Sequence, residues 1–122
     1  MQITLFSFGY KHGLPEADTI LDVRFLPNPF YVDTLKSGTG LEQKVAEYVL
    51  DNHVAKEFFP RFEPVLQEYI DLHAKAGRET VRFGIGCTGG RHRSVAVVQY
   101  LEKILNNGTH ELTVFHRDIE KA

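Results

Sequence analysis

Hydrophobic residues along the chain fall into short continuous runs and longer amphipathic stretches. The runs at 2–8 (QITLFSF), 19–25 (TILDVRF) and 80–86 (TVRFGIG) are rich in β-branched and aromatic residues, and each ends at or just before glycine or proline. This composition predicts three buried strands. The stretch 110–118 (HELTVFHRD) predicts a last, short strand.

Three stretches between these runs have apolar residues at helical spacing. The spacing predicts helices over 41–52, roughly 54–76, and 93–107. Pro60 and Pro64 fall inside the second of these, where a proline removes a backbone donor and clashes with the preceding turn. We therefore predict a break or a fresh start within that helix.

The predicted order, with residues 30–40 as a polar loop, is β-β-α-α-β-α-β. Strands that alternate with helices favour an α/β fold, and we expect one small domain over 1–122 with a mainly parallel sheet covered by helices on both faces. Ligands bind such sheets beyond the carboxyl ends of the strands. Polar loops follow the predicted strand ends at 9–15, 26–30 and 87–94.

Composition and charge narrow the classes of function. The 122 residues carry a formal net charge of −2 with a pI near 6.3, which disfavours a strongly basic surface for nucleic acid. Cys87 is the only cysteine, so no intramolecular disulfide can form, and a reducing compartment is expected. No apolar run approaches the ~20 residues that cross a bilayer, and no secretory signal is evident. We expect a cytoplasmic protein without membrane association.

The stretch GCTGGRHRS, which joins the third strand to the last helix, has the groups that an anion site needs. Its glycines allow close backbone approach, its hydroxyl and guanidinium groups donate hydrogen bonds, and the helix N-terminus adds unpaired amides. Each residue taken singly fits an ordinary strand-to-helix turn. Together they predict a phosphate-binding strand-loop-helix formed by Cys87, Thr88, Gly89, Gly90, Arg91, His92, Arg93 and Ser94.

A catalytic interpretation of the same loop is the alternative. Cys87, five residues and then Arg93 and Ser94 match the Cys-x5-Arg-Ser/Thr loop of protein tyrosine phosphatases. There the cysteine attacks phosphorus and the arginine clamps the phosphoryl oxygens. Gly86 stands where those enzymes usually carry histidine, and His92 stands where they usually carry glycine. The six histidines show no metal-ligand spacing, and neither a metal nor another cofactor is predicted.

Several separated motifs resemble one known family. SFGYKHGLP (7–15), DVRFLPNPF (22–30) with TGL (39–41), IGCTGGRHRSVAV (85–97) and HRDIEK (116–121) resemble, in the same order, the C-terminal domain of the bacterial RNase adapter RapZ. The resemblance implies a regulatory domain that senses an amino-sugar phosphate, glucosamine-6-phosphate, and presents small RNAs to a ribonuclease. It also implies a homo-oligomer. No Gly-x4-Gly-Lys-Ser/Thr occurs in this chain, so the nucleotide hydrolysis tied to that motif is not expected.

The resemblance also implies a ligand pocket in which His12 joins Thr88, Gly89, Gly90 and Arg93. Asp22 and Arg24, two residues apart on one strand face, contact either the sugar side of the ligand or each other in a salt bridge.

RNA binding is less favoured by the sequence than ligand binding. Members of the family that bind RNA end in a basic tail, whereas here Asp118 and Glu120 offset the cations. Lys103, Arg117 and Lys121 are the remaining candidates for RNA contacts.

Overall fold

The computed structural model describes residues 1–121 and confirms the α/β class. Its single sheet has the order β2-β3-β1-β4, and every neighbouring pair is parallel. The strands are β1 (Gln2–Gly9), β2 (Thr19–Asp22), β3 (Thr80–Cys87) and β4 (Glu111–His116). The helices are α1 (Gln43–Leu50), α2 (His53–Lys75) and α3 (Arg93–Leu105), with two short 3-10 turns, η1 (Tyr10–His12) and η2 (Pro29–Tyr31).

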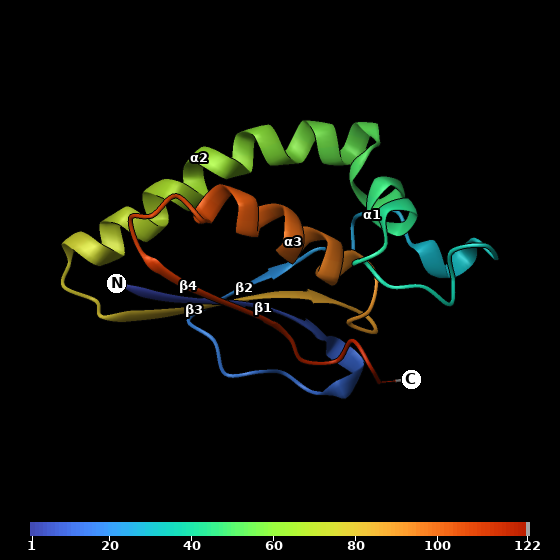
Figure 1. Ribbon diagram of the computed structural model, residues 1–122, viewed down its shortest axis with the longest axis horizontal. Coiled ribbons are helices and arrows are strands. Elements are labelled where there is room, and N and C mark those ends of the chain that lie inside the picture. Colours follow the sequence, from blue (N-terminus) through green and yellow to red (C-terminus); the bar gives the residue numbers. More distant parts are fainter. Residues whose placement is uncertain (122) are drawn as a thin grey trace.

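All three helices cover one face of the sheet, so the expectation of helices on both faces is wrong (Figure 1). The chain steps one way across the sheet from β1 to β2, and the opposite way from β2 to β3 and from β3 to β4. Right-handed crossovers therefore place the first connection on one face and the other two on the opposite face. That first connection, residues 10–18, contains only η1, and the helices lie in the other two connections.

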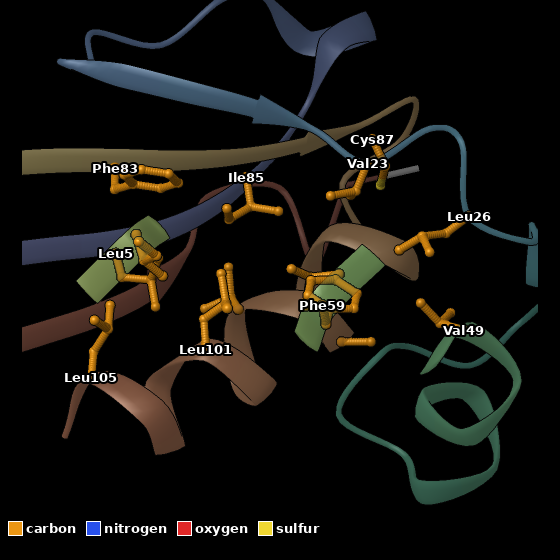
Figure 2. Packing of buried hydrophobic residues seen from close by; sticks show 14 of the residues in the cluster. Leu5, Val23, Leu26, Val49, Phe59, Phe83, Ile85, Cys87, Leu101 and Leu105 are labelled. Carbon is orange, nitrogen blue, oxygen red and sulfur yellow. The ribbon is translucent and has the colours of Figure 1, made fainter. Parts of the chain in front are cut away.

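The main core lies between the sheet and the helices. Odd-numbered residues of β1 and β3 point into it, among them Leu5, Phe83 and Ile85. Figure 2 shows these side chains beside Leu101 and Leu105 of α3. The core ends at Cys87, which belongs to the same buried cluster and begins the loop predicted to bind phosphate. The candidate site therefore begins where the hydrophobic core ends.

Side chains, not a helix, cover the other face of the sheet. Phe6 and Phe8 are fully buried there, and their rings occupy space left by the glycines of β3. A Cβ atom on Gly86 would lie 2.5 Å from the Phe8 ring. Phe6 is stacked on Phe115 with ring centroids 5.0 Å apart, and the Arg82 guanidinium carbon lies 5.0 Å from the centre of the Phe6 ring.

α2 runs unbroken from His53 to Lys75, so the predicted break at Pro60 and Pro64 is wrong. Both prolines are exposed, as is Lys56, one turn before Pro60. Water can therefore satisfy the carbonyls that lose their helical donors on this side. Within residues 1–121, no helix combines the length and the apolar character needed to cross a bilayer.

Candidate functional site

The loop from β3 to α3 wraps around the Cys87 sulfur. The backbone N–H of Gly90 donates to Cys87 Sγ at 3.3 Å, and the thiol donates to Ser94 Oγ at 3.1 Å. Gly90 adopts a φ of +78°, which lets its N–H turn back toward the sulfur. Cys87 and Ser94 are both buried. The contact between Cys87 and Ser94 holds the two ends of the loop together.

Two glycines bring the end of β1 against this loop. A Cβ atom on Gly9 would lie 2.4 Å from the carbonyl carbon of Gly89, and one on Gly90 would lie 2.5 Å from the Gly9 nitrogen. Real side chains essentially never tolerate such contacts. The end of β1 and the loop after β3 therefore meet backbone to backbone, which explains why Gly9 and Gly90 are glycines.

A buried carboxylate, Asp118, holds this contact in place. Its Oδ2 accepts a hydrogen bond from the Gly9 N–H at 2.7 Å, and its oxygens lie 2.8 Å from Arg117 Nη2 and 2.7 Å from Lys121 Nζ. Burial alone would raise the pKa of Asp118, but the hydrogen bonds from Arg117, Gly9 and Lys121 outweigh it and hold that pKa well below its ordinary value. Asp118 is therefore ionised and fully paired.

The segment 36–40 packs against the start of α3. Gly40 N donates to the Arg91 carbonyl at 2.8 Å, and a Cβ atom on Gly40 would lie 2.4 Å from the Ala96 nitrogen. His92 Nε2 lies 3.0 Å from the Lys36 carbonyl oxygen. Burial lowers the pKa of His92 more than its backbone hydrogen bonds raise it, so the ring is neutral at pH 7.

Arg93 is the buried cation of the site, with only 6% of its surface exposed. Its Nη1 donates to the carbonyl of Arg24 at 2.8 Å and lies 3.4 Å from that of Leu26, which anchors one edge of the guanidinium. Its Nη2 lies 3.5 Å from Thr88 Oγ1, and its Nε is buried without a hydrogen-bond partner in the described part of the chain. The planar group therefore has donors left for a ligand.

These elements enclose a cavity of about 600 Å³ at the carboxyl ends of the strands. Three segments line it: η1, the stretch from 28 to 37, and the loop after β3. Four cations lie on its wall against one carboxylate, Asp33, although the whole chain has a net charge of −2. The lining residues are Lys11, Asn28, Phe30, Tyr31, Asp33, Lys36, Ser37, Cys87, Thr88, Gly89, Arg91, His92 and Arg93.

Six of the eight loop residues singled out in the sequence line this cavity. The other two, Gly90 and Ser94, are buried beside the Cys87 sulfur. His12 is not part of the lining, and its Nε2 is buried without a partner among residues 1–121. Lys11, its neighbour in η1, lines the cavity instead.

Asp22 and Arg24 pair with each other, as one of the two sequence-based interpretations held. Arg24 Nη2 lies 2.6 Å from Asp22 Oδ2, and the Arg24 guanidinium carbon lies 4.0 Å from the centre of the Tyr10 ring. Neither side chain is part of the cavity wall. The hydrogen bonds from Arg24 lower the pKa of Asp22, so this ion pair is held at neutral pH.

The three cations considered for RNA do not form one surface. Arg117 and Lys121 both contact the buried Asp118 carboxylate. Lys103 lies in the last turn of α3, which starts at the carboxyl ends of the strands and runs back along the sheet. It therefore lies at the other end of α3 from the loop after β3, outside the cavity wall.

Sequence reasoning placed residues 26–30 at a strand end beside the site, but it missed the part of the wall formed by residues 31–37, which was interpreted only as a polar loop. Its signal was present in the neighbouring aromatic residues Phe30 and Tyr31, which follow two prolines in a segment with no strand or helix pattern. Among residues 1–121, no three histidine, cysteine, aspartate or glutamate side chains converge as a metal site requires.

Comparison with known proteins places the chain in a family. The RapZ C-terminal domain family matches residues 1–120. The chain belongs to the RapZ C-terminal domain family. This confirms the resemblance that the separated motifs carried.

Relatives of this domain in several bacteria bear the name "Nucleotide-binding protein". The chain is 50% identical to one from Caldicellulosiruptor bescii over 99% of its own length, and 43% identical to one from Carboxydothermus hydrogenoformans over 99%. A third, from Limosilactobacillus reuteri, is 43% identical over 98% of the chain. The chain spans 42% of the length of each of these relatives.

Proposed function

We propose that this domain is a regulatory module that binds a phosphorylated metabolite, with the phosphate held by the loop from Thr88 to Arg93. The observation that carries the proposal is the Arg93 guanidinium, which lines the cavity with Nη1 anchored to the carbonyls of Arg24 and Leu26 and with no carboxylate beside it within the described residues, while Nη2 has only a 3.5 Å contact with Thr88 Oγ1. Burying a cation without an anionic partner is costly, and a bound phosphate would supply that anion.

The charge distribution supports an anionic ligand. Lys11, Lys36, Arg91 and Arg93 line one cavity in a protein that is negative overall. Like charges gathered around a cavity raise the local concentration of a counter-charged ligand and strengthen its binding. The start of α3 adds the partial positive charge of a helix N-terminus.

Two ligand classes fit this proposal. The family resemblance supports an amino-sugar phosphate, and the names of the relatives support a nucleotide. Both carry a phosphate monoester, which the loop would recognise in the same way.

A calorimetric titration of the protein tests the phosphate site. We would compare glucosamine-6-phosphate, glucose 6-phosphate, AMP and inorganic phosphate with unphosphorylated glucosamine and adenosine. We expect binding only by the phosphorylated compounds, together with a rise in stability of about 2.7 kcal/mol at a hundredfold excess of ligand over Kd.

The matched variants are Arg91→Ala, which removes a cavity cation, and Arg61→Ala, which removes an exposed arginine paired with Glu57 on α2. Arg91→Ala should weaken phosphate binding at least about tenfold and Arg61→Ala should leave it unchanged. Equal effects of the two variants, or equal binding of adenosine and AMP, would contradict the proposal.

A second candidate function, phosphomonoester hydrolysis, is favoured by the contacts of the Cys87 sulfur. Gly90 N–H donates to it, and the Ser94 hydroxyl can rotate to donate to a thiolate. The thiol would lose its proton as the sulfur attacks phosphorus, the phosphorus–oxygen ester bond would break, and the alcohol would leave with that proton. Water would then hydrolyse the phosphocysteine to thiol and phosphate.

Cys87→Ser separates the two functions. Hydrolysis would show as release of p-nitrophenol from p-nitrophenyl phosphate that disappears in Cys87→Ser. A binding module would show the same ligand affinity in both proteins and no release.

RNA and ribonuclease partners and assembly into a homo-oligomer stay predictions of the family resemblance. Because Arg117 and Lys121 contact Asp118, they offer less free charge to RNA than their number suggests. An RNA titration at two salt concentrations tests RNA binding, because contacts to RNA phosphates make the affinity fall steeply with salt.

A further inference from the structure

One flank of α2 carries apolar residues that remain partly or largely exposed. Four of them recur at intervals of four or seven positions, which places them on one line along the helix surface. They are Val54, Phe58, Val65 and Leu72. Val65 is 61% exposed and Leu72 is 55% exposed. The core uses another side of the helix, around Phe59, Leu66 and Ile70, so core packing does not explain this line.

The N-terminal half of this flank borders an apolar groove of about 490 Å³. Phe25, Phe58 and Phe62 form much of its wall. The rings of Phe25 and Phe58 meet edge to face with centroids 4.9 Å apart, and those of Phe58 and Phe62 stack at 5.2 Å. Phe25 is 45% exposed. Covering such a surface with apolar side chains removes it from water, which favours association.

Two opposite charges lie on the same line. Arg61 and Glu68 stand on either side of Val65, four and three residues from it. Arg61 makes one exposed ion pair, at 3.3 Å, with a glutamate of its own helix, and an exposed pair of this kind contributes little stability. From Phe58 to Leu72 the order along the line is therefore apolar, basic, apolar, acidic, apolar.

This order is complementary to itself when a second copy of α2 lies antiparallel to the first. A twofold axis at Val65 makes the two Val65 side chains face each other. Phe58 and Leu72 are each seven residues from Val65, so each faces the other across the axis. Arg61 of each copy comes opposite Glu68 of the other. A parallel pair would instead bring like charges together, which disfavours it.

We propose that this flank of α2 is the surface through which two copies of the chain associate, antiparallel about a twofold axis at Val65. Leu72 of each copy packs beside Phe58 at the groove of the other. A twofold interface repeats every contact, so each favourable pair counts twice. The family resemblance implies assembly without a surface for it, whereas the residue order on α2 supplies the surface and its direction. The pairing does not depend on the phosphate site.

Sedimentation velocity of the protein from micromolar to millimolar concentration tests the pairing. We expect a reversible equilibrium between monomer and dimer. Val65→Asp places two carboxylates opposite each other at the axis and should weaken dimerisation at least about a hundredfold. Leu14→Asp is the matched control, because Leu14 is 73% exposed and lies outside α2. It should leave dimerisation unchanged.

An exchange of charges tests the antiparallel direction. Arg61→Glu alone brings carboxylates together on both sides of the axis and should weaken dimerisation at least about tenfold. Adding Glu68→Arg to the same chain restores opposite charges and should return dimerisation to the wild-type strength. Lys56→Glu reverses an exposed cation on the other flank of α2 and should have no effect. Melting temperatures check that every variant is folded.

Three outcomes would overturn the proposal. A protein that stays monomeric at millimolar concentration leaves the groove to another kind of partner. A dimer that Val65→Asp does not weaken is joined through another surface. A dimer that the double charge exchange does not restore is not antiparallel about Val65.

Discussion

The backbone N–H of Gly9 donates a hydrogen bond to the buried carboxylate of Asp118 at 2.7 Å, across 109 residues of sequence. This bond joins the end of β1 to the chain that follows β4. It lies directly behind Gly90, whose Cβ position is 2.9 Å from Asp118 Cβ. One carboxylate therefore supports both backbones that form the floor of the candidate site.

Replacing that carboxylate should destabilise the fold. Asp118→Asn keeps the shape but removes the charge that Arg117 and Lys121 contact, and losing hydrogen bonds to a charged group costs about 1.5–3 kcal/mol. Urea unfolding measures this change. Asp51→Asn removes an exposed carboxylate paired with Lys56 and should have little effect. Equal effects of the two variants would show that Asp118 is not structural.

The same carboxylate should make the protein sensitive to acid. The pKa of Asp118 is lower in the folded state than the 3.8 of a free aspartate. Its contribution to stability is therefore fully present above about pH 4 and is lost as pH falls toward its folded pKa. Unfolding free energies measured from pH 5 to pH 2 should fall less steeply in Asp118→Asn than in the wild type.

Gly90 and Gly108 have nearly the same backbone conformation in different surroundings. Their φ angles are +78° and +79°, but a Cβ atom on Gly90 meets the Gly9 nitrogen at 2.5 Å, whereas one on Gly108 meets nothing within 4 Å. Gly108→Ala should therefore cost only the backbone strain of about 1–2 kcal/mol. Gly90→Ala should lower the free energy of unfolding clearly more than Gly108→Ala does, which urea unfolding measures. It should also weaken phosphate binding, which calorimetry measures.

The half-buried ring of His116 predicts a loss of stability in mild acid. Its Nδ1 lies 2.7 Å from Ser7 Oγ and its Nε2 accepts from the Gln99 amide at 2.8 Å, so the neutral ring is the form that fits. Burial lowers the pKa of His116 below 6.5. Its stabilising contribution is present above pH 6.5 and is lost as pH falls through the folded pKa.

His116→Gln should flatten this dependence between pH 7 and pH 5. Because burial also lowers the pKa of His92, part of the slope should remain in the variant. Thermal melts across this pH range provide the measurement. An unchanged slope in His116→Gln would show that the ring does not titrate with folding.

Replacing either of the two prolines of α2 should increase the stability of the protein. A proline in a helix interior costs about 3 kcal/mol relative to alanine, and Pro60 and Pro64 are both exposed, so no packing is lost when they are changed. Pro60→Ala and Pro64→Ala should each raise the unfolding free energy by about 1–3 kcal/mol. A loss of stability in either variant would show that the proline has a structural role.

The sequence predicted the parts of the site that are local in the chain. Cys87 to Ser94 lie between a strand and a helix whose patterns are clear, so their place at the sheet edge followed from the periodicity alone. The break at Pro60 was wrong because propensity rules treat a proline without regard to its exposure. Tertiary packing of the opposite face of α2 overrides that penalty.

Residues 31–37 of the other cavity wall could not be found in this way. Phe30 and Tyr31 reach the loop after β3 only through the sheet order, which places β2 beside β3 although some 60 residues separate them. The prediction that helices cover the second face of the sheet was wrong for a similar reason. No local pattern shows that Arg82 and Phe115 cover Phe6 in place of a helix.

The position of β1 at the centre of the sheet has a consequence for synthesis on the ribosome. β1 pairs with β3 and β4, so Gln2 meets Thr80 on one side and Glu111 on the other. Its first partner, β3, follows it by more than seventy residues, and contacts between such distant segments form slowly. Within this domain β1 thus waits for both of its partner strands, and the floor beneath the loop after β3 closes only when Asp118 has left the exit tunnel.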